Sequence, residues 1–257
     1  SLKEATWAIP SDFLEYTHYE RAVKQLDWTS SPGYPYMRRA TTNGVLFKVE
    51  DGVPAFEKLQ EYWEVVKMQI KDRLADPIRL FIKAEPLKEK KLEEGRYRLI
   101  SSVSVVDQII DHMLFGVMNK EMIDNWIHIP PKVGWNQLNG GWRIIPHEQW
   151  MALDKSSWDW TVHPWLAEIV LSVRAKLCSN LDDRWMQLAL WRYQELFINA
   201  TFITSGGLLL KQVNPGVMKS GCVNTITDNS KTQRILHIRV SMELNIEIEP
   251  LYSMGDD

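Results

Sequence analysis

The sequence predicts an α+β fold, and three observations support this prediction. Segments with the 3.6-residue period of a helix and short apolar segments typical of strands both occur, without the regular alternation of a parallel α/β sheet. The chain has 257 residues, enough for one or two domains with a sizeable core. Its content of 45% hydrophobic and 25% charged residues is that of an ordinary globular protein.

Composition also excludes several classes of protein. No stretch approaches the roughly 18 uncharged apolar residues that a membrane-spanning helix needs, and no signal peptide is recognisable. Cys178 and Cys222 are the only cysteines, so the sequence predicts neither a disulfide framework nor a zinc cluster, and a reducing compartment fits. The net charge of −3 argues against a protein that coats nucleic acid with its whole surface, but it allows a local basic channel.

Helices are predicted wherever apolar side chains recur every three or four residues. The clearest helix covers residues 54–75, and Asp76-Pro77 ends it. A second strong helix covers residues 105–126. The other segments with this period are 164–178, 181–196 and 221–239.

Short apolar segments predict the strands. They are 78–84, 150–153, 197–204, 208–213 and 246–252. Ser205-Gly206-Gly207 separates the third segment from the fourth, which is typical of a β-hairpin. The second and the last segments are each followed directly by residues that carry carboxylates.

Carboxylates gather at the ends of these two predicted strands. Asp154 ends one strand and Asp159 follows it, while Gly255 places Asp256 and Asp257 in a tight turn after the other. If the strands are antiparallel neighbours, we expect the carboxylates of Asp154 and Asp256 to lie about 4–7 Å apart, close enough to share two Mg²⁺ ions. Each segment alone is more typical of a solvated turn than of a metal site.

A mixed-charge segment, KAEPLKEKKLEEGRYR, covers residues 83–98. Such a segment is usually a solvated surface. Arg96 and Arg98, however, lie two apart on a strand-like stretch, so their side chains would share one face. Because guanidinium groups pair with phosphate in a fork geometry, the segment is a candidate clamp for a triphosphate.

Small and polar residues dominate the segment KSGCVNT at 219–225. Small residues allow close approach to a ribose, and Asn229 shares a helical face with Thr225 because it follows four residues later. Hydrogen bonds to a 2′-hydroxyl distinguish RNA from DNA. A helix N-terminus capped by Ser220 is the simpler alternative. A turn-rich loop, TSSPGYPY at 29–36, is likewise typical of an ordinary proline turn.

Together and in this order, these segments resemble the RNA-dependent RNA polymerase of positive-strand RNA viruses, within the picornavirus-like supergroup and its sobemovirus (solemovirus-like) branch. LDKSSWDWTV is similar to motif A, SGCVNTITDN to motif B and Gly255-Asp256-Asp257 to motif C. KAEPLKEKKLEEGRYRLI is similar to motif F and SSPGYPY to motif G. GWNQ and MKSGCVNT resemble the sobemovirus branch in particular.

The resemblance implies a right-hand polymerase fold with fingers and palm present and the thumb absent. Residues 1–98 would form the fingers, and residues 99–257 the palm with a fingers-type insertion. The thumb would follow Asp257. Since the chain also begins at Ser1 without a methionine, we expect it to be a fragment.

The resemblance also implies roles for the site residues. The catalytic and metal-binding residues would be Asp154, Asp256 and Asp257, with two Mg²⁺ or Mn²⁺ ions as cofactors. The residues implied to bind the nucleoside triphosphate are Lys83, Lys91, Arg96, Arg98, Asp159, Ser220, Thr225 and Asn229. Those implied to bind the template are Ser30, Ser31, Gly33, Tyr34 and Gly221.

The implied activity is template-directed RNA synthesis in viral genome replication. Its partners would be an RNA template and primer, nucleoside triphosphates and, as a further candidate, a genome-linked protein primer, in host cytoplasm at virus replication complexes. One alternative is a reverse transcriptase-like polymerase, although Asp159 with Asn229, and Gly255 before the two acids, favour RNA synthesis. Two others are an RNA-binding fragment without turnover and a soluble α+β domain with solvated acids.

Overall fold

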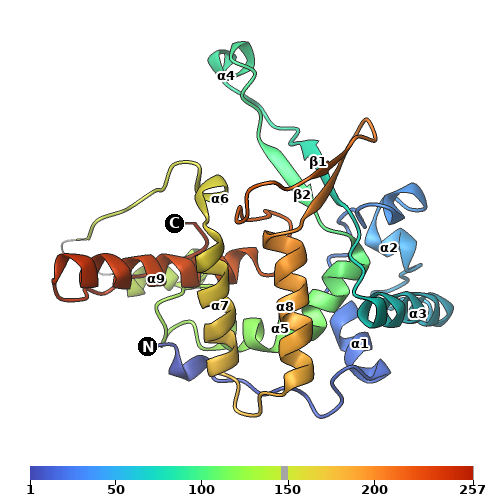
Figure 1. Cartoon of the computed structure of the whole chain (residues 1–257), viewed down its shortest axis with the longest axis horizontal. Helices are drawn as coiled ribbons and strands as arrows, with labels where there is room; N and C mark the ends of the chain where they lie inside the picture. Colours follow the sequence, from blue (N-terminus) through green and yellow to red (C-terminus); the bar gives the residue numbers. More distant parts are fainter. Residues whose placement is uncertain (146–149, 257) are drawn as a thin grey trace.

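A computed structural model describes residues 1–145 and 150–256 and has the α+β architecture expected from the sequence (Figure 1). Long helices form the body, and a small sheet lies at one edge of it. The helix α5 (Val105–Asp124) is buried along most of its length and packs against α1, α3 and α8. No helix within the described residues is both long and apolar enough to cross a membrane.

All five helices predicted from the apolar period are present. They are α3 (Phe56–Asp72), α5, α7 (Pro164–Lys176), α8 (Asp183–Phe197) and α9 (Thr225–Leu244). The short helices are α1 (Tyr16–Val23), α2 (Asn43–Leu46), α4 (Glu89–Glu93) and α6 (Trp158–Thr161). The 3₁₀ turns are Lys3–Ala5, Tyr36–Arg38, Gln137–Asn139 and Gly141–Ile144.

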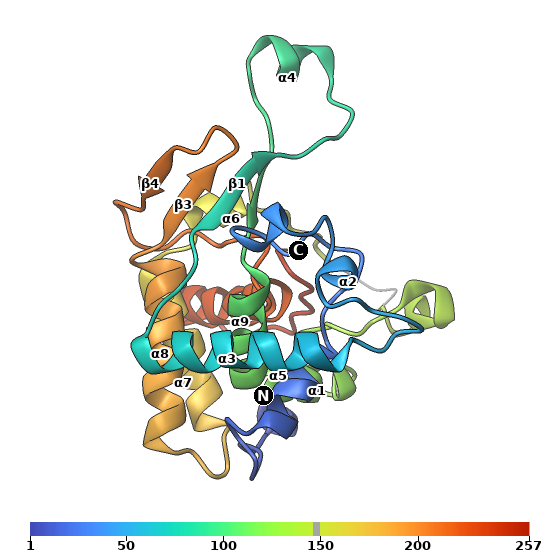
Figure 2. The same cartoon turned by 90° about the vertical axis from the view of Figure 1, so that its right-hand side faces the viewer.

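The sheet has four strands in the order β2 (Leu99–Ser102), β1 (Ile78–Ile82), β3 (Thr201–Thr204) and β4 (Leu209–Lys211). The strand β1 pairs antiparallel with β2 and parallel with β3. The hairpin β3–β4 confirms the prediction from Ser205-Gly206-Gly207. The connection from β1 to β2 carries α4 and projects from the body as an arm, which comprises residues 83–98 (Figure 2).

Two predicted strands are not formed. Residues 150–153 are irregular, and so are residues 246–252, where the chain leaves α9. An apolar segment becomes a strand only where its backbone finds a partner, and these two segments do not pair with each other. Their side chains stay exposed, to 79% at Met151 and 56% at Ile246. The expectation that Asp154 and Asp256 end adjacent antiparallel strands is therefore wrong.

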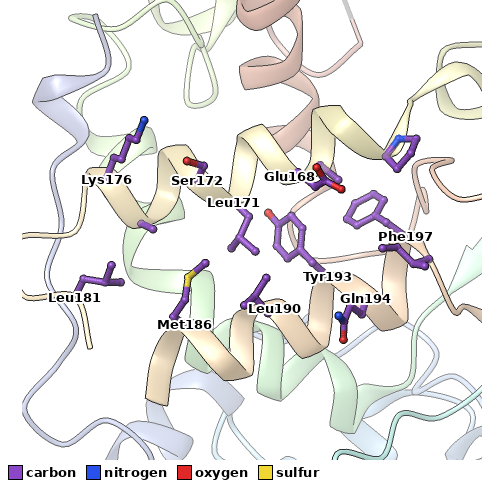
Figure 3. Close-up of a pocket in the computed structure, with 14 residues that line it drawn as sticks. Glu168, Leu171, Ser172, Lys176, Leu181, Met186, Leu190, Tyr193, Gln194 and Phe197 are labelled. Atoms are coloured by element: carbon purple, nitrogen blue, oxygen red, sulfur yellow. The ribbon is translucent and has the colours of Figure 1, made fainter. Parts of the chain in front are cut away.

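The helices α7 and α8 lie side by side and leave an apolar groove of about 430 Å³ between them (Figure 3). Side chains such as Leu171, Leu190 and Phe197 line it. None of the residues that line this groove was predicted to belong to the site, so the groove is separate from the chemistry discussed below.

Buried ion pairs hold the long helices in register. On α8, Arg192 donates to Asp107 and to Asp111 of α5, each at 2.7 Å. On α7, Arg174 donates to Asp228 of α9 at 2.6 Å. Because an unpaired buried charge is costly, each pair fixes the relative position of two helices.

Arg174→Met should destabilise the fold strongly. It leaves the Asp228 carboxylate buried without its closest cation, and the loss of one partner of a buried pair typically costs about 3–5 kcal/mol. Urea unfolding measures the change in the free energy of unfolding. Lys48→Ala, which breaks the exposed Lys48–Glu57 pair, is the matched control and should cost less than about 1 kcal/mol. An equal loss of unfolding free energy in the two variants would contradict the stabilising role of the buried Arg174–Asp228 pair.

Candidate active site

The loop before α9 is fastened to two other segments of the candidate site. Val217 N–H donates to the Val162 carbonyl, and Met218 N–H donates to the Asp159 carbonyl, both at 2.8 Å. Gly221 forms a parallel bridge with Ser102 of β2. A Cβ at Gly221 would lie only 2.2 Å from the Ser101 carbonyl oxygen, so the close approach requires glycine here.

This close packing explains why α9 begins at Thr225 and not at 221 as predicted. Ser220 is exposed, and its hydroxyl accepts a hydrogen bond from Ser101 N–H at 3.4 Å. The Thr225 hydroxyl donates within the loop, to the Lys219 carbonyl at 2.9 Å or the Cys222 carbonyl at 2.8 Å. Residues 220–224 are thus part of the loop that joins α9 to β2.

Lys219 is a structural residue that the sequence did not identify. Its ammonium group is buried and donates to the Gln212 side chain at 2.6 Å and to the carbonyls of Gly216 and Val217 at 3.0 and 2.9 Å. Burial lowers the pKa of Lys219 to about 8. All three acceptors lie in the segment between β4 and α9, which no local sequence pattern predicts.

Asp159 connects three of the predicted motifs. It is the second residue of α6 and is half-buried, and burial raises the pKa of its carboxyl group. The negative charge of Asp256 raises this pKa further, whereas the guanidinium of Arg98 lowers it. Residues predicted to belong to motifs A, C and F therefore lie close enough to interact electrostatically. Figures 1 and 2 show the C-terminal turn close to α6.

A cavity of about 130 Å³ lies beside Asp159. Asp159 and Ser220 both line it, together with Leu99 and Ser101 of β2. Thr225 and Asn229 do not line this cavity. Asn229 is buried on α9, one turn after Thr225, and its side-chain oxygen has no hydrogen-bond partner among the described residues.

The terminal turn rests on α9. Gly255 has a φ of +75°, which favours glycine, and its N–H donates to the Ser230 hydroxyl at 2.8 Å. The carbonyl of Asp256 accepts from the Gln233 amide at 2.6 Å, and the Asp256 side chain is exposed. Asp257 lies outside the described residues.

The structure does not assemble a complete metal centre from the residues it describes. Asp154 is exposed in an irregular segment, and no three His, Cys, Asp or Glu side chains of the described chain are close enough together to hold an ion. The donor chemistry nevertheless fits Mg²⁺. Carboxylate oxygens are its usual protein ligands, and the repulsion between Asp159 and Asp256 is what a bound cation would relieve.

The predicted triphosphate clamp lies on the projecting arm. Glu85 pairs with Lys83 at 2.9 Å and with Arg98 at 3.4 Å, so it holds these two cations together at the base of the arm. Arg96 pairs with Glu94 at 2.6 Å. The prediction that Arg96 and Arg98 lie on a strand is wrong, because β2 begins only at Leu99. Lys91 is exposed on α4.

The predicted template loop docks on the start of α5. The Pro32 carbonyl accepts from Val105 N–H at 2.8 Å, and a Cβ at Gly33 would lie 2.8 Å from the Val103 carbonyl oxygen. Ser30 donates to Asp27 at 2.6 Å, and Ser31 accepts from Gly33 N–H at 3.4 Å. The two serine hydroxyls therefore shape the loop itself, and Tyr34 is half-buried.

Comparison with known proteins identifies relatives of this chain among viral replicases. The chain is 32% identical to the replicase polyprotein P2AB of Southern cowpea mosaic virus, over 99% of this chain and 28% of that protein. It is 34% identical to protein P1-P2 of Potato leafroll virus, over 79% of this chain and 21% of that protein. The chain thus spans less than a third of the length of these relatives, and the predicted sobemovirus relationship is confirmed.

The fold has a counterpart among solved structures. The Sicinivirus 3Dpol RNA-dependent RNA polymerase matches 99% of this chain with a TM-score of 0.71 at 18% identity, and 52% of that polymerase is covered. The described α+β structure therefore corresponds to part of a polymerase fold. The profile of the viral RNA-dependent RNA polymerase family matches residues 13–257, and the chain belongs to this family.

Proposed function

We propose that this chain forms the fingers and palm of a template-directed viral RNA polymerase, with fingers at 1–98 and palm at 99–257. The enzyme would transfer nucleotides from nucleoside triphosphates to an RNA 3′-hydroxyl during genome replication in the host cytoplasm. The observation that carries the proposal is the match of the viral RNA-dependent RNA polymerase family to residues 13–257, which include all five predicted motifs.

The acids supply the metal-binding part of this proposal. Asp154, Asp256 and Asp257 would hold two Mg²⁺ or Mn²⁺ ions, which would activate the 3′-hydroxyl and stabilise the charge around the transferred phosphate. The turn that carries Asp256 is held to α9 through its backbone. The Asp256 carboxylate is therefore available to bind a metal ion. The ring of Trp150 packs against that of Tyr252 at 5.1 Å between centroids, so the segment before Asp154 already contacts the segment before Asp256.

The basic arm supplies the contacts to the triphosphate. Arg98 pairs with Glu85 at 3.4 Å, and its charge lowers the pKa of Asp159. Once metal ions neutralise the nearby acids, the guanidinium would be available to pair with the phosphates of the nucleotide. Lys83, Lys91 and Arg96 would complete the clamp. Because phosphoryl transfer needs little covalent chemistry from the protein, this positioning accounts for most of the catalysis we expect.

The α9 segment supplies recognition of the sugar and the template. Ser220 and Asp159 share a cavity, and the buried amide oxygen of Asn229 has no hydrogen-bond partner within residues 1–145 and 150–256. A ribose 2′-hydroxyl that completed this network would favour RNA over DNA precursors. The residues that we propose to guide the RNA template are Ser30, Ser31, Gly33, Tyr34 and Gly221.

Asp256→Ala and Asp154→Ala should each abolish nucleotide addition in a replicase protein that extends beyond Asp257. Loss of a metal ligand removes several kcal/mol of transition-state stabilisation, so we expect rates to fall about 1,000-fold or more. Primer extension measures the rate, and RNA binding should change little because cations and stacking hold the RNA. Near wild-type extension by either variant would refute the two-metal mechanism.

Arg98→Ala should lower kcat/KM for nucleotides about 10- to 100-fold, because a hydrogen bond to a charged group is worth about 1.5–3 kcal/mol. Steady-state incorporation at varied nucleotide concentration measures this. Lys88→Ala is the control, since Lys88 is exposed on the same arm outside the proposed clamp. If both variants lose the same activity, the arm acts only as a diffuse basic surface.

Asn229→Ala should reduce the preference for ATP over dATP by about one to two powers of ten, mainly through slower use of ATP. The reason is that a site built to bind a hydroxyl discriminates through hydrogen bonds that the deoxy analogue cannot make. Incorporation of a single ATP or dATP opposite uridine gives the ratio. An unchanged ratio would assign Asn229 to helix packing alone.

A further inference from the structure

The turn that carries Asp256 is held by contacts other than a strand ladder. Residues 246–252 are irregular, Ser253 forms an isolated bridge with Pro131, and the Ser253 hydroxyl donates to the Ser230 carbonyl of α9 at 3.0 Å. The position of the Asp256 carboxylate must therefore be set by other contacts. Ser253 is held by backbone hydrogen bonds to Pro130 and Lys132, whereas the contacts at Gly255 and Asp256 come from α9.

Two neighbouring side chains of α9 hold this turn. The buried Ser230 hydroxyl donates to the Ile226 carbonyl at 2.7 Å, which directs its free lone pairs to the Gly255 N–H at 2.8 Å. The buried Gln233 amide donates to the Asp256 carbonyl at 2.6 Å. The backbone is thus held immediately before Asp256 and at Asp256 itself.

The geometry of α9 explains how one helix serves two groups of residues. Ser230 and Gln233 lie three residues apart and so share one face of the helix. Asn229 precedes Ser230 and points about 100° away from it around the helix. A displacement of α9 would therefore move Asn229 and the Asp256 turn together.

We propose that Ser230 and Gln233 are positioning residues that hold Asp256 in the geometry needed to bind a divalent cation, and that they couple the cation site to the sugar-sensing part of α9. Neither residue touches the cation. Each acts on the backbone of the turn, which in turn orients the carboxylate. This inference rests on the proposed polymerase function, in which Asp256 is a metal ligand.

The chain provides a matched control for Ser230. Ser241 is also buried on α9, and its hydroxyl also donates to the carbonyl four residues earlier, that of His237, at 3.0 Å. Its hydroxyl makes no bond to the terminal turn among the described residues. Ser230→Ala and Ser241→Ala thus remove the same helix contact, but only the first releases Gly255.

The test measures Mn²⁺ binding by electron paramagnetic resonance in a complete replicase protein that contains this chain, together with the Mg²⁺ dependence of nucleotide incorporation. Ser230→Ala should raise the dissociation constant for Mn²⁺ about 10-fold or more, as is typical when a residue that orients a metal ligand is lost. It should raise the Mg²⁺ concentration needed for half-maximal incorporation in parallel. Ser241→Ala should leave both values at the wild-type level.

A second variant keeps the test decisive if Ser230→Ala does not fold. Gln233→Met has nearly the same volume but cannot donate to the Asp256 carbonyl, and it should weaken Mn²⁺ binding in the same direction. Wild-type Mn²⁺ affinity in a folded Ser230→Ala or Gln233→Met protein, or an equal loss in Ser241→Ala, would overturn the inference. If instead the wild-type protein binds Mn²⁺ at the Asp256 turn but adds no nucleotide, the proposed function fails, whereas weaker Mn²⁺ binding by Ser230→Ala and Gln233→Met still supports the positioning role.

Discussion

Asp228 is fully buried on α9, where its carboxylate meets Arg174 at 2.6 Å, Tyr193 at 2.7 Å and Lys231 at 2.9 Å. Burial raises the pKa of Asp228, but the charges of Arg174 and Lys231 outweigh it and hold the pKa below its ordinary value. A buried carboxylate with this many partners permits one position of α9 against α7 and α8. The candidate site depends on that position, because Asn229, which we propose to sense the sugar, lies on α9, and the Asp256 turn, which we propose to bind metal, is hydrogen-bonded to it.

Three consecutive residues of α9 show how the fixed position of this helix affects the candidate site. Asp228 pairs with Arg174 in the core, Asn229 is buried with an amide oxygen that no described residue contacts by a hydrogen bond, and Ser230 holds the terminal turn. Successive side chains of a helix point about 100° apart, so one turn can serve packing, recognition and positioning at once. The order of these residues along the chain therefore sets how the three parts are arranged in space.

The sequence predicted the long helices well and the strands only where a partner was near. The helices α3 and α5 follow from their apolar period, which is a local property. Residues 150–153 and 246–252 have the apolar character of strands, but a strand depends on a second segment that no local pattern specifies. Motif spacing along the chain indicated Asp159 and Arg98 as site residues. It did not indicate the carbonyl groups that Lys219 and Gln233 bind, because those contacts depend on how the chain folds back on itself.

The acids of this chain fall into two electrostatic groups. Asp107, Asp111 and Asp228 are buried beside arginines, so the protein itself supplies their counter-charge. Asp159 and Asp256, by contrast, act on each other as like charges, and Arg98, the last residue of the arm, opposes them as a cation. A cation bound near these two carboxylates would offset their mutual repulsion. The contrast with the compensated core explains why we place the chemistry at this turn and not at the larger apolar groove between α7 and α8.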